Sequence, residues 1–222
     1  MRENVLIKYF GGEKNLNTPS RILLVALEEF GEKPPSLVSV NEITRRAECN
    51  VAAVSYYFGG KNELYVELIR QVTEYLRVLE GPFWKRFDEL KLNPSAEGAK
   101  QILRDYFTWR IRVKPIGNKM LKNIFVLIGR EEIYEGKFFA MIHEGFMKSH
   151  MNFMAGAIEM ASKGKIKGDE AKISAMAFVS QIIRFTSSKE YLRLNMNWRT
   201  VGEKKLGQVR DTILNLLDKA LA

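Results

Sequence analysis

The sequence predicts an all-α fold. Apolar side chains recur at the three- and four-residue intervals of a helix along most of the 222 residues, and alternating apolar runs of strand length are absent. Signals for helix ends recur as well, with Ser, Thr or Asn before an apolar stretch and Gly or Pro after it. These observations predict an N-terminal three-helix unit that contains a helix-turn-helix, followed by a larger C-terminal helical domain.

The composition excludes several classes of protein. Hydrophobic residues make up 46% of the chain and charged residues 27%, as in a soluble globular protein. No apolar run approaches the roughly 20 residues of a membrane span, and the apolar run near the N-terminus is too short for a signal peptide. The single cysteine, Cys49, excludes an intramolecular disulfide and offers no metal cluster. We therefore expect a cytoplasmic protein without membrane contact, metal or cofactor.

The excess of basic residues lies outside the predicted helix-turn-helix. A net charge of +9 would by itself suggest a nucleic-acid partner. Residues 1–70 nevertheless carry equal numbers of basic and acidic side chains, so the whole excess falls in residues 71–222. That excess could attract an anionic effector, attract DNA at long range, or serve solubility alone.

The chain opens with a leader, residues 1–17, for which an ordered extra helix and a flexible arm that touches DNA are both open. Thr18 is the expected N-cap of the next helix, and Gly31 closes that helix. The apolar residues between them share one face, which predicts a brace behind the helices that follow. These residues are Leu23, Leu27 and Phe30.

Two short helices joined by a tight turn are predicted within residues 39–61. Ser39 and Glu42 have the spacing of a capping box, in which each side chain bonds to the backbone N–H at the other's position. Asn50 can cap the second helix, residues 51–58, and the glycines at 59 and 60 tolerate the left-handed conformation of a C-cap. Small residues and two tyrosines are left on the exposed face of this second helix.

Such a face suits the major groove of DNA. Small residues let the backbone approach the bases, alanine methyls can touch thymine methyls, and tyrosine hydroxyls can reach phosphates. Two core helices of an ordinary helical domain would give a similar pattern, so the pattern alone leaves both interpretations open.

Four segments resemble the N-terminal domain of the TetR family of transcriptional regulators, in matching order and spacing. Residues 50–59, NVAAVSYYFG, are most similar to the CecR-like branch of that family. Residues 129–132, 143–146 and 187–190 resemble the C-terminal domain of the same branch more weakly. The four N-terminal segments are Thr18–Leu23, Ala26–Gly31, Ser39–Ile43 and Tyr56–Tyr65.

Two positions depart from the family pattern. The turn position that is commonly glycine holds Glu48, and a non-glycine residue seldom adopts a positive φ. The position of the commonest aromatic residue holds Ser55, although the CecR-like branch also carries a small hydroxyl there. This second departure shifts the expected phosphate contacts toward Tyr56 and Tyr57.

The resemblance implies a DNA-binding domain over residues 18–60 and an effector-binding and dimerisation domain over residues 61–222. Residues near helix ends and the two tyrosines are expected to contact phosphates, and the small residues that open the second helix are expected to lie against base edges. Asn50 can reach either. The expected DNA contacts are Thr18, Ser39, Arg45, Asn50, Val51, Ala52, Ala53, Tyr56, Tyr57 and Lys61.

Beyond residue 60, the periodicity predicts helices only. Gly81-Pro82 is expected to end the first of these helices, and Pro115 is expected to end the second. The expected helix ranges are 61–79, 95–113, 118–132, 137–163, 168–194 and 204–221.

The helix expected over residues 137–163 is rich in Met and Phe, which suits a promiscuous ligand pocket and equally suits core packing. His143 and His150 lie about 10 Å apart along its axis, too far to share one metal ion. Arg130 and Arg184 could place charge near a pocket or simply lie in solvent. The candidate effector pocket comprises Trp109, Arg130, Met141, His143, Phe146, Met147, His150 and Arg184.

The resemblance also implies that the last two long helices of each subunit form a four-helix dimer interface. The final helix carries more apolar side chains than a lone terminal helix should expose, which indicates the same partner, a second copy of the chain. The expected interface residues are Ile182, Phe185, Leu206, Val209, Ile213, Leu216 and Leu217.

The sequence therefore predicts a homodimeric, DNA-binding transcriptional regulator, a repressor that a small-molecule effector of unknown identity releases from its double-stranded operator. The resemblance implies that the effector swings the helix that begins at residue 61 and spoils the spacing of the two recognition helices. The sequence contains neither a GxSxG nucleophile elbow nor a GxxxxGK[ST] phosphate loop, so neither of these motifs predicts an enzyme. An enzyme that uses the helical cavity, and a helical scaffold that has lost DNA binding, are the alternatives.

Overall fold

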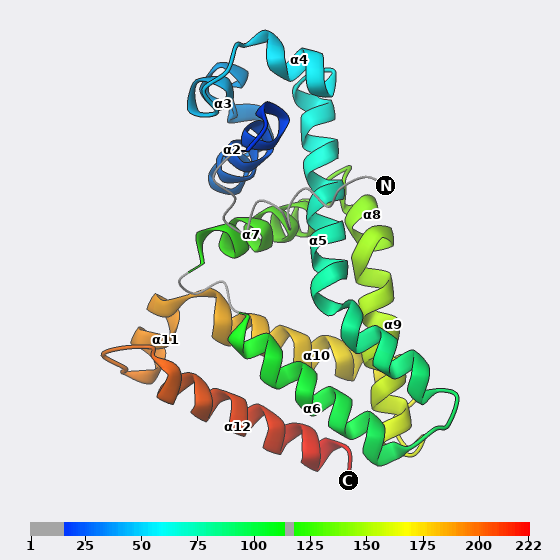
Figure 1. Cartoon of the computed structure of the whole chain (residues 1–222). Coiled ribbons are helices and arrows are strands. Elements are labelled where there is room, and N and C mark those ends of the chain that lie inside the picture. Colours follow the sequence, from blue (N-terminus) through cyan, green and yellow to red (C-terminus); the bar gives the residue numbers. More distant parts are fainter. Residues whose placement is uncertain (1–15, 114–117) are drawn as a thin grey trace. The chain divides into compact units, whose positions relative to one another are not determined.

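The computed structural model describes residues 16–113 and 118–222, and it is built from helices (Figure 1). No strand occurs within these ranges, which confirms the predicted all-α fold. Most of the leader, residues 1–15, and Pro115 lie outside the described residues. None of the described helices is long and apolar enough to cross a membrane. In chain order the helical elements are α2 (Thr18–Glu32), η1 (Pro35–Leu37), α3 (Val40–Arg46), α4 (Ala52–Phe58), α5 (Lys61–Leu90), α6 (Ala96–Arg112), α7 (Lys119–Ile133), α8 (Phe139–Ile142), η2 (His143–Met147), α9 (Lys148–Ala161), α10 (Gly168–Ser187), α11 (Lys189–Met196) and α12 (Glu203–Ala220).

The chain folds into two compact units. The first comprises Met1–Leu79 with Lys119–Met147, and the second comprises Glu80–Asn118 with Lys148–Ala222. Helices α7 and α8 thus belong with the helix-turn-helix, although they follow α6 in the sequence. The functional boundary expected after residue 60 is a different kind of division, and it stays a prediction.

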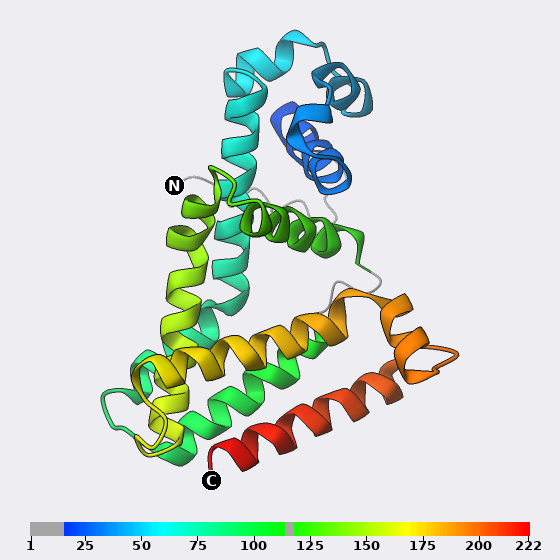
Figure 2. The same ribbon diagram turned by 180° about the vertical axis from the view of Figure 1, so that it is seen from behind.

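The first unit is organised around α2. The apolar face of α2 is fully buried, including Leu27 and Phe30, and α2 packs against α3, α4 and α7 (Figures 1 and 2). The ring of Phe30 meets Tyr65 of α5 edge-on at a centroid distance of 4.7 Å, and Tyr65 meets Phe138 in the same way at 4.8 Å. Burial of each such side chain stabilises the fold by roughly 1.5–3 kcal/mol. The brace predicted behind the helix-turn-helix is confirmed.

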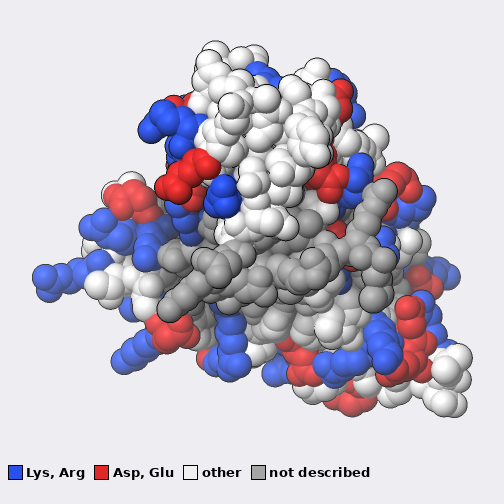
Figure 3. All heavy atoms as spheres, turned by 45° about the horizontal axis from the view of Figure 1, so that its top comes forward, with Lys and Arg blue, Asp and Glu red and all other residues white. Residues whose placement is uncertain are grey.

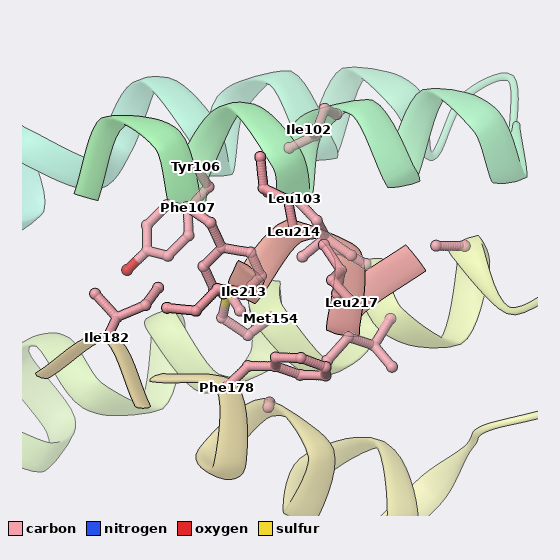
Figure 4. Close-up of a cluster of buried hydrophobic side chains, with 14 of the residues drawn as sticks. Ile102, Leu103, Tyr106, Phe107, Met154, Phe178, Ile182, Ile213, Leu214 and Leu217 are labelled. Atoms are coloured by element: carbon pink, nitrogen blue, oxygen red, sulfur yellow. The ribbon is translucent and has the colours of Figure 1, made fainter. Parts of the chain in front are cut away.

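The second unit is a bundle of α6, α9, α10 and α12 together with the end of α5. Figure 4 shows side chains from four of these helices meeting in one cluster, among them Phe107 of α6, Met154 of α9, Phe178 of α10 and Leu217 of α12. Each of these four side chains is at most 8% exposed. The cluster therefore forms the core of the second unit.

The apolar face of α12 lies in this core and not on the surface. The expectation that this face is exposed is wrong, because α12 covers α6 and α10, whose inner faces would otherwise meet solvent. Among the expected interface residues, Leu216 is 46% exposed and Phe185 is half-buried. The remaining five are buried: Ile182, Leu206, Val209, Ile213 and Leu217.

Helix α5 continues through the proline that was expected to end it. The helix runs from Lys61 to Leu90 with Pro82 inside it, so the expected end at residue 79 is wrong. A proline in a helix removes one backbone hydrogen bond. The turn after Pro82 gains burial in return, since Phe87 is 5% exposed and Phe83 packs on the core of the second unit. Tertiary packing outweighs the local cost.

Two other expected helices are interrupted. The segment expected as one helix over residues 137–163 contains a π-helical turn, His143–Met147, between α8 and α9. The helix expected over residues 168–194 ends at Ser187, and the Ser188 side chain accepts a hydrogen bond from the Tyr191 N–H at 3.1 Å to begin α11. A capping serine in the interior of an apolar pattern produces the second break.

Candidate nucleic-acid interface

The N-cap of helix α2 lies one residue earlier than predicted. The N-cap is Asn17, whose Oδ1 accepts a hydrogen bond from the Ser20 N–H at 3.2 Å, and Thr18 is the first helical residue. The expectation that Thr18 caps the helix is therefore wrong, because the amide of Asn17 occupies the position from which a side chain can reach the free N–H groups. Thr18 is half-buried at the start of α2.

Helix α3 has its expected start but not its expected capping box. Ser39 is the N-cap, yet its side chain forms no capping hydrogen bond with the described residues. The carboxylate of Glu42 instead pairs with Arg45 at 2.6 Å. The capping box is therefore wrong, since an ion pair within the helix takes the carboxylate that the box requires.

The turn keeps the backbone shape that glycine would favour. Glu48 adopts a φ of 51°, and the Cys49 N–H donates to the Thr44 carbonyl at 3.0 Å. Arg21 of α2 stabilises this turn through two hydrogen bonds. Its Nε donates to the Ala47 carbonyl at 2.9 Å, and its Nη2 donates to the Glu48 carbonyl at 3.4 Å. Two carbonyls of the turn thus obtain partners from outside it, which offsets part of the strain of a positive φ at a glutamate.

The second helix of the motif presents a mixed face of small and aromatic residues. Asn50 Oδ1 accepts from the Ala52 N–H at 2.8 Å, and Gly59 ends α4 in the left-handed conformation with a φ of 88°. Val54 is buried and anchors the helix. Tyr56 is 81% exposed and meets Tyr57 edge-on at a centroid distance of 4.9 Å. The residues left exposed on and before α4 are Asn50, Val51, Ala52, Ser55, Tyr56 and Tyr57, with Ala53 half-buried.

Lys61, at the start of α5, is the basic residue nearest in sequence to this face. Its ammonium donates to the Val38 carbonyl at 2.8 Å, which ties α5 to the segment before α3. An ammonium has three donors. The Val38 contact uses one of them, so Lys61 both closes the motif and keeps donors for another acceptor.

Helix α3, the first helix of the motif, is fixed to α2 by an ion-pair network that no sequence pattern predicted. Arg46 of α3 pairs with both Glu28 and Glu29 of α2. Burial acts to raise the pKa of Glu29, but hydrogen bonds from Lys33 and Arg46 outweigh it and the pKa lies below its usual value. Burial opposes Lys119 and Arg46 in the same way at Glu28, whose pKa is also lowered. Both carboxylates are thus held ionised.

Charge alone does not mark the exposed face of α4. In Figure 3 the end of the molecule that carries α3 and α4 faces forward, and its centre is mostly uncharged, with Lys, Arg, Asp and Glu gathered around it. Among the expected DNA contacts, Arg45 is the most exposed cation, with a side chain that is 70% exposed. This surface suits contact through shape, methyl groups and hydroxyls more than through a dense positive patch.

Two surface pockets among the described residues are lined by side chains other than the candidate effector residues. Arg130 donates to backbone carbonyls at the end of α2, and His150 Nδ1 lies 2.7 Å from Glu80 Oε2 in a buried pair. Arg184 stacks over Tyr191, with its guanidinium carbon 3.4 Å from the ring centre. The other candidates range from buried to exposed: Trp109, Met141, His143, Phe146 and Met147. The effector pocket stays a prediction.

The described residues contain no group of His, Cys, Asp and Glu side chains arranged to hold a metal ion. Cys49 is half-buried, and burial raises the pKa of its thiol against the opposing charge of Arg21. A neutral thiol is a poor nucleophile and a poor metal ligand. Cys49 therefore acts as a small side chain in the turn.

Comparison with known proteins finds a family of regulators that matches the region of this motif. Residues 22–68 match the family model described as bacterial regulatory proteins, tetR family. Over 211 residues the chain is 22% identical to the HTH-type transcriptional dual regulator CecR of Shigella flexneri, and the match covers 94% of this chain and 93% of that protein.

Solved structures of regulators share the fold. AibR, solved in complex with isovaleryl coenzyme A and operator DNA, has a TM-score of 0.61 at 15% identity, covering 90% of this chain and 97% of that one. NalD of Pseudomonas aeruginosa, the secondary repressor of the MexAB-OprM multidrug efflux pump, has a TM-score of 0.58 at 18% identity, covering 91% and 95%. At such identities the likeness shows the fold.

Proposed function

The chain belongs to the TetR family of transcriptional regulators, and from this premise we propose that it is a homodimeric repressor that binds a specific operator through α4. The single observation that carries the proposal is the exposed face of α4. There Val51, the N-cap, is 51% exposed and Tyr56 is 81% exposed, and α4 itself packs against α2 and α3. Exposed apolar and aromatic side chains that lie together on one helix mark a surface that a partner can cover.

The face of α4 has the chemistry that double-stranded DNA requires. The methyl groups of Ala52 and Ala53 fit against base edges, and the hydroxyls of Tyr56 and Tyr57 can donate to phosphates on either side of the groove. The N-terminus of α5 supplies further free N–H groups beside Lys61. We assign the base contacts to the small residues and the phosphate contacts to the tyrosines and Lys61.

A second copy of the chain is the expected partner of α10. With the apolar face of α12 already buried, three of the exposed apolar side chains of the second unit form a stripe on α10: Ile173 at 66% exposure, Met176 at 59% and Ile183 at 38%. These positions repeat at helical spacing on one face. Leu216 of α12 is exposed as well. We therefore propose that a dimer forms through α10 with a contribution from Leu216.

A dimer carries two copies of α4 and would therefore bind an operator with two half-sites. Two recognition helices can engage one face of DNA only if their separation matches one or a few helical turns. A small molecule that favours a different separation would release the DNA, and it must bind the released state more tightly to do so. The effector is a further part of the proposal, and the Met- and Phe-rich sequence of residues 137–163 supports it, because flexible Met side chains adapt to varied ligands.

The effector has a direct test at Phe146 and Met147. A polar substitution at either position should leave DNA binding intact and remove the response to a small molecule that a library screen identifies by loss of DNA binding. If no compound in the screen alters the DNA affinity, the effector part of the proposal fails while the DNA-binding part stands.

Selection of bound duplexes from a random DNA library tests the main proposal. The wild-type protein is bound to the library at moderate salt, and the retained duplexes are sequenced over several rounds. We expect enrichment of one motif with two related half-sites, because a symmetric dimer reads a symmetric site. Retention of all sequences alike, or of none, would contradict the proposal.

A further inference from the structure

The outer face of α7 carries an exposed apolar stripe. Val126 is 39% exposed and Ile133 is 76% exposed, and together with Lys122 and Gly129 they recur at intervals of three and four residues along one helix face. This stripe lies opposite the buried side chains of α7. Exposed apolar side chains grouped on one face mark a surface that another molecule can cover.

Gly129 lies in the middle of this stripe and leaves space for a close approach. A Cβ atom at Gly129 would meet none of the described atoms within 4 Å. The backbone of a second helix can come closest where a residue has no side chain beyond hydrogen. The stripe therefore fits another helix that crosses α7 at Gly129, with Val126 and Ile133 on either side of the crossing point.

The charges along the exposed side of α7 run against the dipole of the helix. Its first turn contains Lys122 and no acidic residue, whereas Glu132 and Glu135 lie exposed at its C-terminal end. A helix dipole favours the reverse, with acidic side chains near the N-terminus and basic ones near the C-terminus. Arg130, a cation of the last turn, is turned toward α2, where it donates to a backbone carbonyl. The exposed charges therefore suit a partner whose own charges run in the opposite direction.

A second copy of α7, packed antiparallel, has this opposite order. If two copies cross at Gly129, Val126 of one copy lies beside Ile133 of the other, because these residues are about 4.5 Å and 6 Å from the glycine along the axis. Lys122 and Glu135 lie about 10 Å and 9 Å from the crossing point, on opposite sides of it. Each lysine is then level with the glutamate of the other copy, so apolar and charged groups match in one arrangement.

We propose that this face of α7 is a contact between two copies of the chain, packed antiparallel about a two-fold axis at Gly129. The contact is isologous, since each copy contributes the same residues. One pair of helix faces buries less than the roughly 1,200–2,000 Å² of a stable interface, so the contact is weak by itself. It goes beyond the proposed dimer through α10, because it joins the first units of two copies and so favours the binding of two copies of α4 to one duplex.

A thiol at the crossing point tests the contact in the protein alone. Gly129→Cys is made together with Cys49→Ser, which removes the single natural thiol, and the protein is treated with oxidised glutathione. Because the proposed axis passes at Gly129, the two thiols come within reach of a disulfide. The matched control is Gly81→Cys, since Gly81 also lies in a helix and a Cβ atom there would meet none of the described atoms within 4 Å. Covalent pairs should form roughly tenfold faster at position 129 than at position 81, because the contact raises the effective concentration of the thiols.

An exchange of charges tests the antiparallel order. Added to Gly129→Cys, Lys122→Glu sets two carboxylates against each other and should slow the crosslinking by about two- to fivefold at low salt. Glu135→Lys should do the same with two ammonium groups. The two changes together restore opposite charges and should recover the rate, and high salt should remove all of these differences. Melting temperatures are measured alongside to confirm that every variant folds.

A charge in the apolar stripe tests the consequence for DNA binding, and this part rests on the proposed function. The probes are the duplex that the wild-type protein selects most strongly and the same duplex with one half-site scrambled. Ile133→Glu should weaken binding to the first by about three- to tenfold and to the second by less than about twofold. Leu92→Glu, at a position 80% exposed in the second unit, is the control and should match the wild type on both.

The possible outcomes are distinct. Equal crosslinking at positions 129 and 81, or a double charge variant that is no faster than the single ones, would overturn the contact through α7. Equal effects of Ile133→Glu on both duplexes would overturn its part in DNA binding. A wild-type protein that selects no duplex would overturn the proposed function, whereas rapid crosslinking at position 129 would still support the contact between two copies of α7.

Discussion

Arg46 of α3 holds the carboxylate of Glu29 in α2 at a position where the Glu29 side chain is only 3% exposed. The carboxylate has a second cationic partner, Lys33, at 2.9 Å. Without Arg46, the buried Glu29 carboxylate would keep only one of these two cationic partners, Lys33. The pair therefore fastens the first helix of the motif to its brace, and it provides a direct test of how the motif is held.

Arg46→Met should lower the free energy of unfolding by about 2 kcal/mol, the cost of leaving a buried carboxylate incompletely paired. Urea denaturation at neutral pH measures it. Arg193→Met is the control, since Arg193 forms an exposed pair with Glu190 at 2.9 Å and should cost little. The double variant with Glu29→Met should recover part of the loss. Equal losses at Arg46 and Arg193 would show that the network is not buried in solution.

The same carboxylates predict a dependence of stability on acid. The pKa values of Glu28 and Glu29 are lowered on folding from a usual value of 4.5, because ion pairs with Arg46, Lys33 and Lys119 outweigh burial. Groups of this kind contribute stability in full above the unfolded pKa and lose it as the pH falls through the folded pKa. The stability difference between the wild type and Glu29→Gln should thus be constant near neutral pH and shrink below about pH 4.5. Denaturant titrations from pH 7 to pH 3 measure it, and a difference that grows in acid would reverse the assigned sign.

Lys61 is predicted to contact phosphate. Lys61→Ala should weaken binding to cognate and random duplexes by the same factor and lower the salt slope by roughly one. Its contact with the Val38 carbonyl means that the melting temperature must be followed as well. An unchanged salt slope for Lys61→Ala would refute the phosphate contact.

Tyr57→Phe removes one hydroxyl and should cost about 1 kcal/mol of binding free energy if that hydroxyl meets phosphate.

Ala53 is predicted to lie against base edges. Ala53→Leu adds bulk where the fit to the groove is close, so it should weaken binding to the cognate duplex more than binding to random DNA. The comparison uses both duplexes at several salt concentrations. Should both affinities fall by the same factor, the assignment of the base contacts to the start of α4 would be wrong.

The dimer is predicted to depend on α10. Met176→Glu and Ile183→Glu place charges on its exposed stripe and should give folded monomers that bind DNA weakly. Ile213→Glu is the contrasting change: Ile213 is 1% exposed in the core of the second unit, so this variant should lose its fold. Analytical ultracentrifugation at micromolar concentration measures the mass. A monomeric wild-type protein would contradict the dimer.

Much of the helix-turn-helix could be predicted from sequence because its signals are local. The stop at Gly59 and the bond from the Ala52 N–H to Asn50 follow from residue types within a few positions of each other. Glu48 departs from the glycine common in the family, yet its positive φ keeps the turn in the shape that glycine favours, and the support for that shape does not come from nearby residues. That support comes from Arg21, 26 residues before Ala47, and no local pattern predicts such a bond.

The rest depended on tertiary context. Pro82 looked like a helix end because its local cost is known, whereas the burial of Phe87 that outweighs it is a property of the folded core. The apolar face of α12 was assigned to a partner because periodicity shows that a face is apolar but not what covers it. Likewise, the charge of Arg130 was visible in the sequence, but its acceptors at the end of α2 were not.

The two units differ in how much of the chain must be synthesised before each of them can fold. During synthesis, the contacts of the first unit become available once residue 147 has left the ribosome, because that unit ends with η2. The core of the second unit needs Leu217 and Leu221, which leave the ribosome later. The helix-turn-helix and α7 can therefore assemble while α6 still lacks its cover, and the exposed inner face of α6 is the surface most open to aggregation in a nascent or truncated chain.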